Sequence, residues 1–237
     1  PVVVESTLYV GSSDGKVYAL DAVYGEKKWE FNTGAKIWTS PAVKDDVVYI
    51  SNYGHKFFAL SSTDGSLRWE IELPAAIASS PAVSGEKVFF GTFDHQLYAV
   101  DHTNGDVKWT FEGGNWFWST PVVKGDVVYA GCLDHRVYAL KASTGEEIWR
   151  FAADSQIVST PVLVDNLLVV ASESGKIYML KVDNGDSERT VSIGGPIVAP
   201  LYAEKDTVYV HARNRCVYSV NAQSGEISWK FCYSDIK

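Results

Sequence analysis

Residues 19–29 read Ala-Leu-Asp-Ala-Val-Tyr-Gly-Glu-Lys-Lys-Trp: a strand, a turn closed by glycine, and a second strand that ends on tryptophan. The pattern returns about every 40 residues along the chain, which is the spacing of a supersecondary unit in a repeat fold. The glycines of the pattern stand in one register, at Gly25, Gly65, Gly105, Gly145, Gly185 and Gly225. A fixed period with strand character is typical of folds in which each repeat packs on its neighbours.

Each repeat contains four short apolar runs, which the second repeat shows most clearly at 41–43, 47–50, 56–60 and 67–71. The runs are rich in β-branched and aromatic residues, with turn residues between them, which predicts strands. No segment shows the apolar period of a helix. Six four-stranded antiparallel units fit a six-bladed β-propeller. We therefore predict one all-β domain over residues 1–237, with blades at 1–40, 41–80, 81–120, 121–160, 161–199 and 200–237.

A tight turn is expected between the second and third strands of each blade, and in the first blade it is Asp14-Gly15. We expect both central residues of this turn to have positive φ. His55, His95 and His135 occupy the second position in three successive blades. Neighbouring packed sheets lie about 10 Å apart, too far for equivalent imidazoles to converge on zinc at about 2 Å. We interpret the histidines as turn residues and predict no metal site.

The tryptophan that ends each pattern is expected to hold neighbouring blades together. A tryptophan buries about 150–250 Å², so equivalent copies would dominate the cohesion between blades. The fifth repeat has Arg189 in this position, and we predict that its contact with the next blade is the weakest. The predicted docking residues are Trp29, Trp69, Trp109, Trp149 and Trp229.

The chain has three cysteines, too few for a disulfide scaffold. A hairpin that turns near Ser224 would place Cys216 roughly opposite Cys232. A cross-strand disulfide fits an oxidising compartment, whereas two buried free thiols are the interpretation that we favour.

The net charge of −8 and the isoelectric point of about 5.1 argue against nucleic acid or an anionic membrane as the main partner. No apolar run approaches the roughly 18 residues of a membrane span, so we expect no direct membrane insertion. The chain begins at Pro1 without a signal peptide or an initiating methionine, and its compartment and oligomeric state stay open.

We expect the loops between blades and the turns between second and third strands to share one face. Blades two to four bring aromatic residues to it, and the remaining blades bring charged ones such as Glu173. Aromatic side chains beyond those needed for docking are typical of interaction surfaces. A second interpretation is that Trp38 and Trp118 fill the central channel. The predicted binding surface comprises Trp38, Tyr53, His55, Phe93, His95, Trp116, Phe117, Trp118, His135 and Arg213.

The pattern Ala-x-Asp-x-x-x-Gly-x-x-x-Trp is complete at residues 19–29 and 99–109 and resembles the tryptophan-docking repeat of the pyrroloquinoline quinone (PQQ)-like propeller family. The resemblance covers the whole chain and implies a propeller that works outside the cytoplasm, in the periplasm or at the cell surface. The family includes quinoprotein dehydrogenases, which normally have eight blades, two adjacent cysteines and a calcium site. This sequence has no adjacent cysteines, and no calcium ligand of the family can be placed on it.

We therefore predict a non-catalytic module, without cofactor or catalytic residues, that binds a protein or peptide partner through its loop face. The alternative is a small molecule or a PQQ-type cofactor with calcium in the central channel, with or without oxidoreductase chemistry. A convergent set of acidic and basic side chains would favour that alternative.

Overall fold

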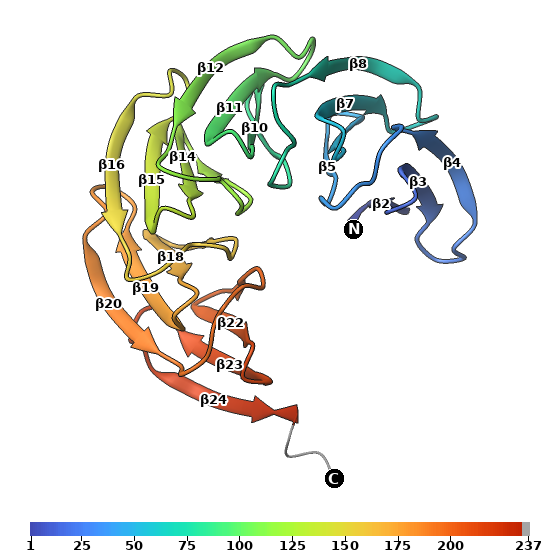
Figure 1. Cartoon of the computed structure of the whole chain (residues 1–237). Coiled ribbons are helices and arrows are strands. Elements are labelled where there is room, and N and C mark those ends of the chain that lie inside the picture. The colour runs from blue at the N-terminus through green and yellow to red at the C-terminus, as the bar shows by residue number, and fades with distance from the viewer. Residues whose placement is uncertain (234–237) are drawn as a thin grey trace. The chain divides into compact units, whose positions relative to one another are not determined.

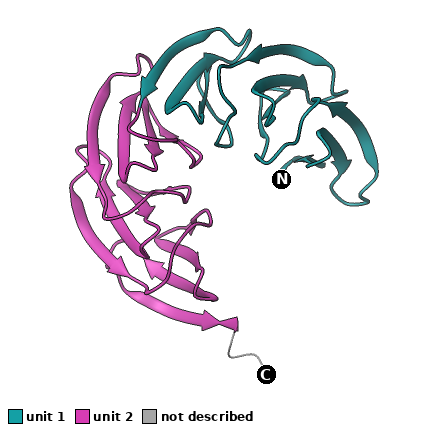
Figure 2. Cartoon of the chain, in the orientation of Figure 1, with its two compact units in different colours: residues 1–112 teal, residues 113–237 magenta. Residues whose placement is uncertain are grey.

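The computed structural model describes residues 1–233, in which 24 strands form six four-stranded antiparallel sheets (Figure 1). The predicted all-β architecture is confirmed. The chain divides into two compact units, residues 1–112 and residues 113–237 (Figure 2). The single domain predicted over residues 1–237 stays a prediction.

Unit 1 contains three sheets, and in each of them the strands lie side by side in chain order. The first is β1 (Val2–Val4), β2 (Thr7–Gly11), β3 (Lys16–Asp21) and β4 (Lys27–Asn32). The second is β5 (Ala42–Lys44), β6 (Val47–Ser51), β7 (Lys56–Ser61) and β8 (Leu67–Glu72). The third is β9 (Ala82–Ser84), β10 (Lys87–Gly91), β11 (Gln96–Asp101) and β12 (Val107–Glu112).

Unit 2 repeats this arrangement three times. Its first sheet is β13 (Val122–Lys124), β14 (Val127–Gly131), β15 (Arg136–Lys141) and β16 (Glu147–Ala152). The second is β17 (Val162–Val164), β18 (Leu167–Ala171), β19 (Lys176–Lys181) and β20 (Ser187–Ser192). The third is β21 (Tyr202–Glu204), β22 (Thr207–Ala212), β23 (Cys216–Asn221) and β24 (Ile227–Cys232).

The core of each unit lies between successive sheets, along the two middle strands of each. All five residues of β6 are buried, and so are all five of β18. A strand covered on both faces needs an apolar side chain at nearly every position, which explains continuous runs such as Val47-Val48-Tyr49-Ile50. The short apolar runs of the sequence form the middle strands of these sheets, because stacking between two other sheets buries both of their faces.

The turn between the second and third strands differs from the expected two-residue turn. In the first sheet the amide of Gly15 donates to the Ser12 carbonyl at 3.1 Å, and the Ser12 amide donates to the Lys16 carbonyl at 3.0 Å. This is a three-residue loop, a type I turn followed by a left-handed residue, so only the last position needs positive φ. The prediction that both central residues have positive φ is wrong.

The histidines lie at the left-handed position of this loop, as the sequence predicts. The φ angles are 68° at His55, 68° at His95 and 72° at His135, against 88° at Gly15 in the first sheet. Histidine is among the few non-glycine residues that adopt this conformation with some frequency. Backbone geometry therefore accounts for the three histidines.

A tryptophan on the last strand of one sheet packs over a glycine turn of the next. The indole Nε1 of Trp29 donates to the Ser62 carbonyl at 2.8 Å, and the ring lies over Gly65, where a Cβ would stand 2.6 Å from Cε3. The φ of Gly65 is 73°, so both the conformation and the ring require glycine. The same contact joins Trp69 to Gly105 in unit 1 and Trp149 to Gly185 in unit 2.

Two residues at the tryptophan position of the repeat, Trp229 and Arg189, do not form this contact. Trp229 is 46% exposed, because β21–β24 is the last sheet of unit 2 and no described strand of that unit follows it. The docking role predicted for Trp229 therefore has no partner within unit 2. Arg189 lies over Gly225, where a Cβ would stand 3.3 Å from its Cδ, and its guanidinium reaches Glu188 at 3.4 Å. Only the aliphatic stem of the arginine fills the place of the indole.

Replacing Arg189 by tryptophan is expected to raise the free energy of unfolding by about 1 kcal/mol, because an indole would bury more apolar area over Gly225. Urea unfolding followed by circular dichroism measures the change. The matched control is Glu188→Trp, at an exposed neighbouring position with no glycine beneath it. An equal gain from both variants, or a loss from Arg189→Trp, would contradict the prediction that this contact is the weakest.

Cys216 and Cys232 form a disulfide, and the favoured interpretation of two free thiols is wrong. The two residues are direct partners across β23 and β24, with Cα atoms 4.0 Å apart. The sequence predicts the hairpin but not its register, and a shift of one residue would have turned the two side chains to opposite faces. Cys132 is buried and free.

Candidate functional site

The loop between one sheet and the next lies beside the turn between the second and third strands of that next sheet. Main-chain hydrogen bonds join the two: from the second sheet onward, the amide at the tip of the turn donates to a carbonyl of the preceding loop. In unit 1 the bonds run from Tyr53 to Lys36 at 2.7 Å and from Phe93 to Ala76 at 3.0 Å. In unit 2 they run from Leu133 to Trp116 at 3.0 Å, from Glu173 to Gln156 at 2.9 Å and from Arg213 to Pro196 at 2.8 Å. The loops and turns thus form one face in each unit.

Phe117 does not belong to the surface on which we predicted it. It is completely buried and packs on Tyr138, with ring centroids 5.8 Å apart. The burial of Phe117 could have been predicted from the sequence. In each of the four other loops the equivalent residue is a buried isoleucine, at Ile37, Ile77, Ile157 and Ile197. An apolar residue that recurs in every repeat anchors the loop, whereas a binding residue is free to vary.

Unit 1 carries an aromatic surface, which we define as Trp38, Tyr53 and Phe93. The ring centroids of Trp38 and Tyr53 are 4.8 Å apart, and those of Tyr53 and Phe93 are 6.2 Å apart. Trp38 is 66% exposed and Tyr53 is 48% exposed, while Phe93 is half-buried. The structure therefore brings together three predicted residues from two sheets of unit 1.

The remaining predicted residues border these loops. His55 is exposed and His95 half-buried at their turns in unit 1, and His135 is exposed in unit 2. Trp116 and Trp118 are also exposed, on either side of the buried anchor of their loop. Arg213 is exposed at the tip of the turn in the last sheet.

Unit 2 has a hollow of about 370 Å³ on its loop face, which we call the loop hollow. Trp118, Val158 and Val198 hold the same position in three successive loops, and they form one row. The tips of three successive turns form a second row, with Leu133, Glu173 and Arg213. Gln156 completes the lining. We predicted Glu173 and Arg213 on this face from the sequence, but not Val158 and Val198.

Asp134 is a structural carboxylate rather than a candidate acid or base. It accepts hydrogen bonds from the Tyr138 hydroxyl at 2.5 Å, the Gly114 amide at 3.1 Å and the Arg136 guanidinium at 3.1 Å. Burial alone would raise its pKa, but the hydrogen bonds, that of Tyr138 first, hold the pKa below its usual value. The Arg136 amide donates to the same carboxylate at 3.0 Å, and an ionised carboxylate held by these four donors fixes the turn.

Cys132 is likewise unsuited to nucleophilic chemistry. Burial raises the pKa of its thiol to about 12, and Sγ lies 3.2 Å from the Asn115 carbonyl. The thiolate is the reactive form of cysteine, so this side chain stays protonated and inert at neutral pH.

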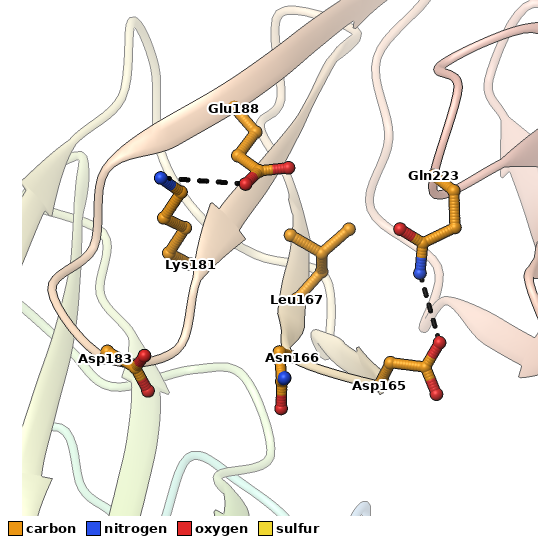
Figure 3. Close-up of a pocket in the computed structure, with 7 residues that line it drawn as sticks. All are labelled: Asp165, Asn166, Leu167, Lys181, Asp183, Glu188 and Gln223. Carbon is orange, nitrogen blue, oxygen red and sulfur yellow. Dashed lines mark hydrogen bonds and ion pairs between the residues drawn. The ribbon is translucent and has the colours of Figure 1, made fainter.

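A second pocket of unit 2, of about 280 Å³, lies among the β17–β18, β19–β20 and β23–β24 turns (Figure 3). Its charges are partly paired: Lys181 lies 3.7 Å from Glu188, and the Gln223 amide donates to Asp165 at 3.1 Å. Leu167 supplies its apolar part. The bond between Gln223 and Asp165 joins turns of two neighbouring sheets, whereas the pair of Lys181 and Glu188 lies within one sheet. We assign the pocket no binding role.

Among residues 1–233, no three His, Cys, Asp or Glu side chains come together so as to hold a metal ion. In the same part of the chain, no helix has the length and apolarity to span a membrane.

The repeated sheets and their tryptophan contacts define the class of protein, a β-propeller of PQQ-like repeats. The family model described as "Outer membrane protein assembly factor BamB" matches residues 13–132, 114–188 and 161–235, and the chain belongs to this family. The resemblance to the PQQ-like propellers is thereby confirmed.

Solved structures show the same fold. The chain is similar to BamB from Moraxella catarrhalis, with 24% identity and a TM-score of 0.85 over 97% of this chain and 71% of that one. It is also similar to the computationally designed Ika8 protein, with 18% identity and a TM-score of 0.81 over 90% of this chain and 67% of that one. No curated protein matches the sequence.

Proposed function

We propose that this chain is a non-catalytic interaction module that binds a protein or peptide partner through its loop face, outside the cytoplasm. The aromatic surface of unit 1 carries the proposal. Exposed, mutually packed aromatic rings supply a large contact area with little loss of side-chain entropy on binding, which is why they are enriched in interfaces. The turn tips that bear Tyr53 and Phe93 are held by main-chain hydrogen bonds, so the surface is organised before a partner arrives.

The family description supports a role in assembly. The family is named for an outer membrane protein assembly factor, and the partner that we propose is a protein component of such an assembly. The disulfide between Cys216 and Cys232 supports an oxidising compartment such as the periplasm. Two carboxylates of unit 2 near the loops, Asp134 and Asp154, accept hydrogen bonds from the Tyr138 and Tyr178 hydroxyls. We propose on these grounds that no cofactor takes part.

A photo-crosslinking experiment tests the proposal. Benzoylphenylalanine placed at Tyr53 in the native source is expected to give a crosslink to one partner, which mass spectrometry identifies. The matched control is the same residue at Tyr24, which is more exposed but lies in the turn between β3 and β4. The double variant Trp38→Ala and Tyr53→Ala is expected to weaken binding of the identified partner at least tenfold. Equal crosslinking at Tyr53 and Tyr24, or unchanged affinity of the double variant, would contradict the proposal.

A further inference from the structure

We infer that the loop hollow of unit 2 binds an extended peptide segment in which one apolar residue lies between a basic and an acidic residue. The inference rests on the proposed function and specifies the charged and apolar residues of the peptide that the partner would present. It concerns the part of the loop face that carries charge, whereas the aromatic surface lies in unit 1.

The first row of the hollow supplies an apolar wall. Trp118 is exposed, and Val158 and Val198 are half-buried at the same position of the following loops. Each follows the buried anchor of its loop, which is Phe117, Ile157 or Ile197. A hollow of about 370 Å³ lies within the size range of binding pockets and has room for an aliphatic or aromatic side chain.

The second row supplies two opposite charges without partners. Neither Glu173 nor Arg213 forms an ion pair or a side-chain hydrogen bond with any residue among 1–233, although their main-chain amides are held. Other charged residues of the unit are paired, such as Lys176 with Asp154 at 3.0 Å. Glu173 and Arg213 therefore present opposite charges on successive turns whose backbone is fixed. Such a surface selects a ligand that carries a basic group and an acidic group in the matching order.

Side chains at neighbouring tips can approach each other more closely than the sheets that carry them. Packed sheets lie about 10 Å apart, but in unit 1 the ring centroids of Tyr53 and Phe93, at the equivalent tips, are 6.2 Å apart. In an extended peptide, residues i and i+2 point to the same side and lie about 6.6 Å apart. A basic residue for Glu173 and an acidic residue for Arg213 would then have one residue between them. That residue can turn toward the wall formed by Trp118 and the two valines.

Three synthetic peptides test the inference, with acetylated and amidated ends and the central sequences Lys-Leu-Asp, Lys-Leu-Lys and Asp-Leu-Asp between glycines. Binding to the full chain is followed by NMR through the indole signal of Trp118. We expect Lys-Leu-Asp to bind about fivefold more tightly than the other two, the upper end of what one exposed charge pair contributes. The variant Arg213→Glu is expected to prefer Lys-Leu-Lys, and Glu173→Lys is expected to prefer Asp-Leu-Asp.

Glu146→Lys is the control, because it changes the net charge as Glu173→Lys does but lies in the turn between β15 and β16. Equal affinity for all three peptides, or the same change of preference in Glu146→Lys, would overturn the inference. Crosslinking at Tyr53 separates this result from the proposed function. If it persists while the peptides bind without preference, the partner uses the aromatic surface and the inference about the hollow is wrong. If the preference is found and Tyr53 gives no crosslink, the hollow binds peptides and the aromatic surface does not.

Discussion

Replacing Trp149 by alanine is expected to lower the free energy of unfolding by about 3–5 kcal/mol. The side chain is only 8% exposed, and its Nε1 donates to the Val182 carbonyl at 2.9 Å. Its ring covers Gly185 and lies 5.7 Å from the ring of Tyr129. Alanine would leave a cavity between two sheets, which cannot easily collapse around such a space. The Val182 carbonyl would lose the indole donor and keep only the Tyr129 hydroxyl, at 3.3 Å.

Urea unfolding followed by far-ultraviolet circular dichroism measures this loss without relying on the removed fluorophore. Trp229→Ala is the matched control, since Trp229 has the same place in its repeat but is 46% exposed. We expect it to cost less than about 1 kcal/mol. Equal losses in the two variants would show that burial between sheets is not what makes the docking tryptophan stabilising.

Reduction of the disulfide is expected to lower the stability of the last sheet by about 3 kcal/mol. The bond joins residues 16 apart, and closing a loop of that length lowers the entropy of the unfolded chain and so raises its free energy by about this much. Hydrogen exchange of the β23 and β24 amides, with and without dithiothreitol, measures the change where the bond lies.

The double variant Cys216→Ala and Cys232→Ala should show the low stability in both conditions, whereas Cys132→Ala should respond to dithiothreitol as the wild type does. Unchanged exchange on reduction of the wild type would mean that the hairpin is held by its strands alone. A response that disappears in Cys132→Ala would assign the effect to the free thiol.

The repeat could be predicted from the sequence because its signals are local. The glycine at the turn and the tryptophan four residues later, as at Gly25 and Trp29, fix a strand, a turn and a strand without reference to distant residues. The positive φ of His55 could be predicted for the same reason. Such features depend on the chain within a few residues, and all of them recur.

The features that the sequence did not reveal depend on register and on packing between repeats. Whether Cys216 meets Cys232 depends on one residue of register between two strands. Whether Phe117 faces the core or solvent depends on the sheet beside it, although comparison with Ile157 would have shown its place. The loop hollow needed the structure, because its two rows come from residues about 40 apart that meet only when sheets stack.

The bonds between loops and turns have a consequence for how such a face can change over evolution. Because Tyr53, Leu133, Glu173 and Arg213 all hold their place through the amide nitrogen, the scaffold is indifferent to what each side chain is. A substitution at one tip would therefore change the chemistry of the face without loss of the bond that positions the turn. Each repeat can vary its contribution to the face independently of the other repeats.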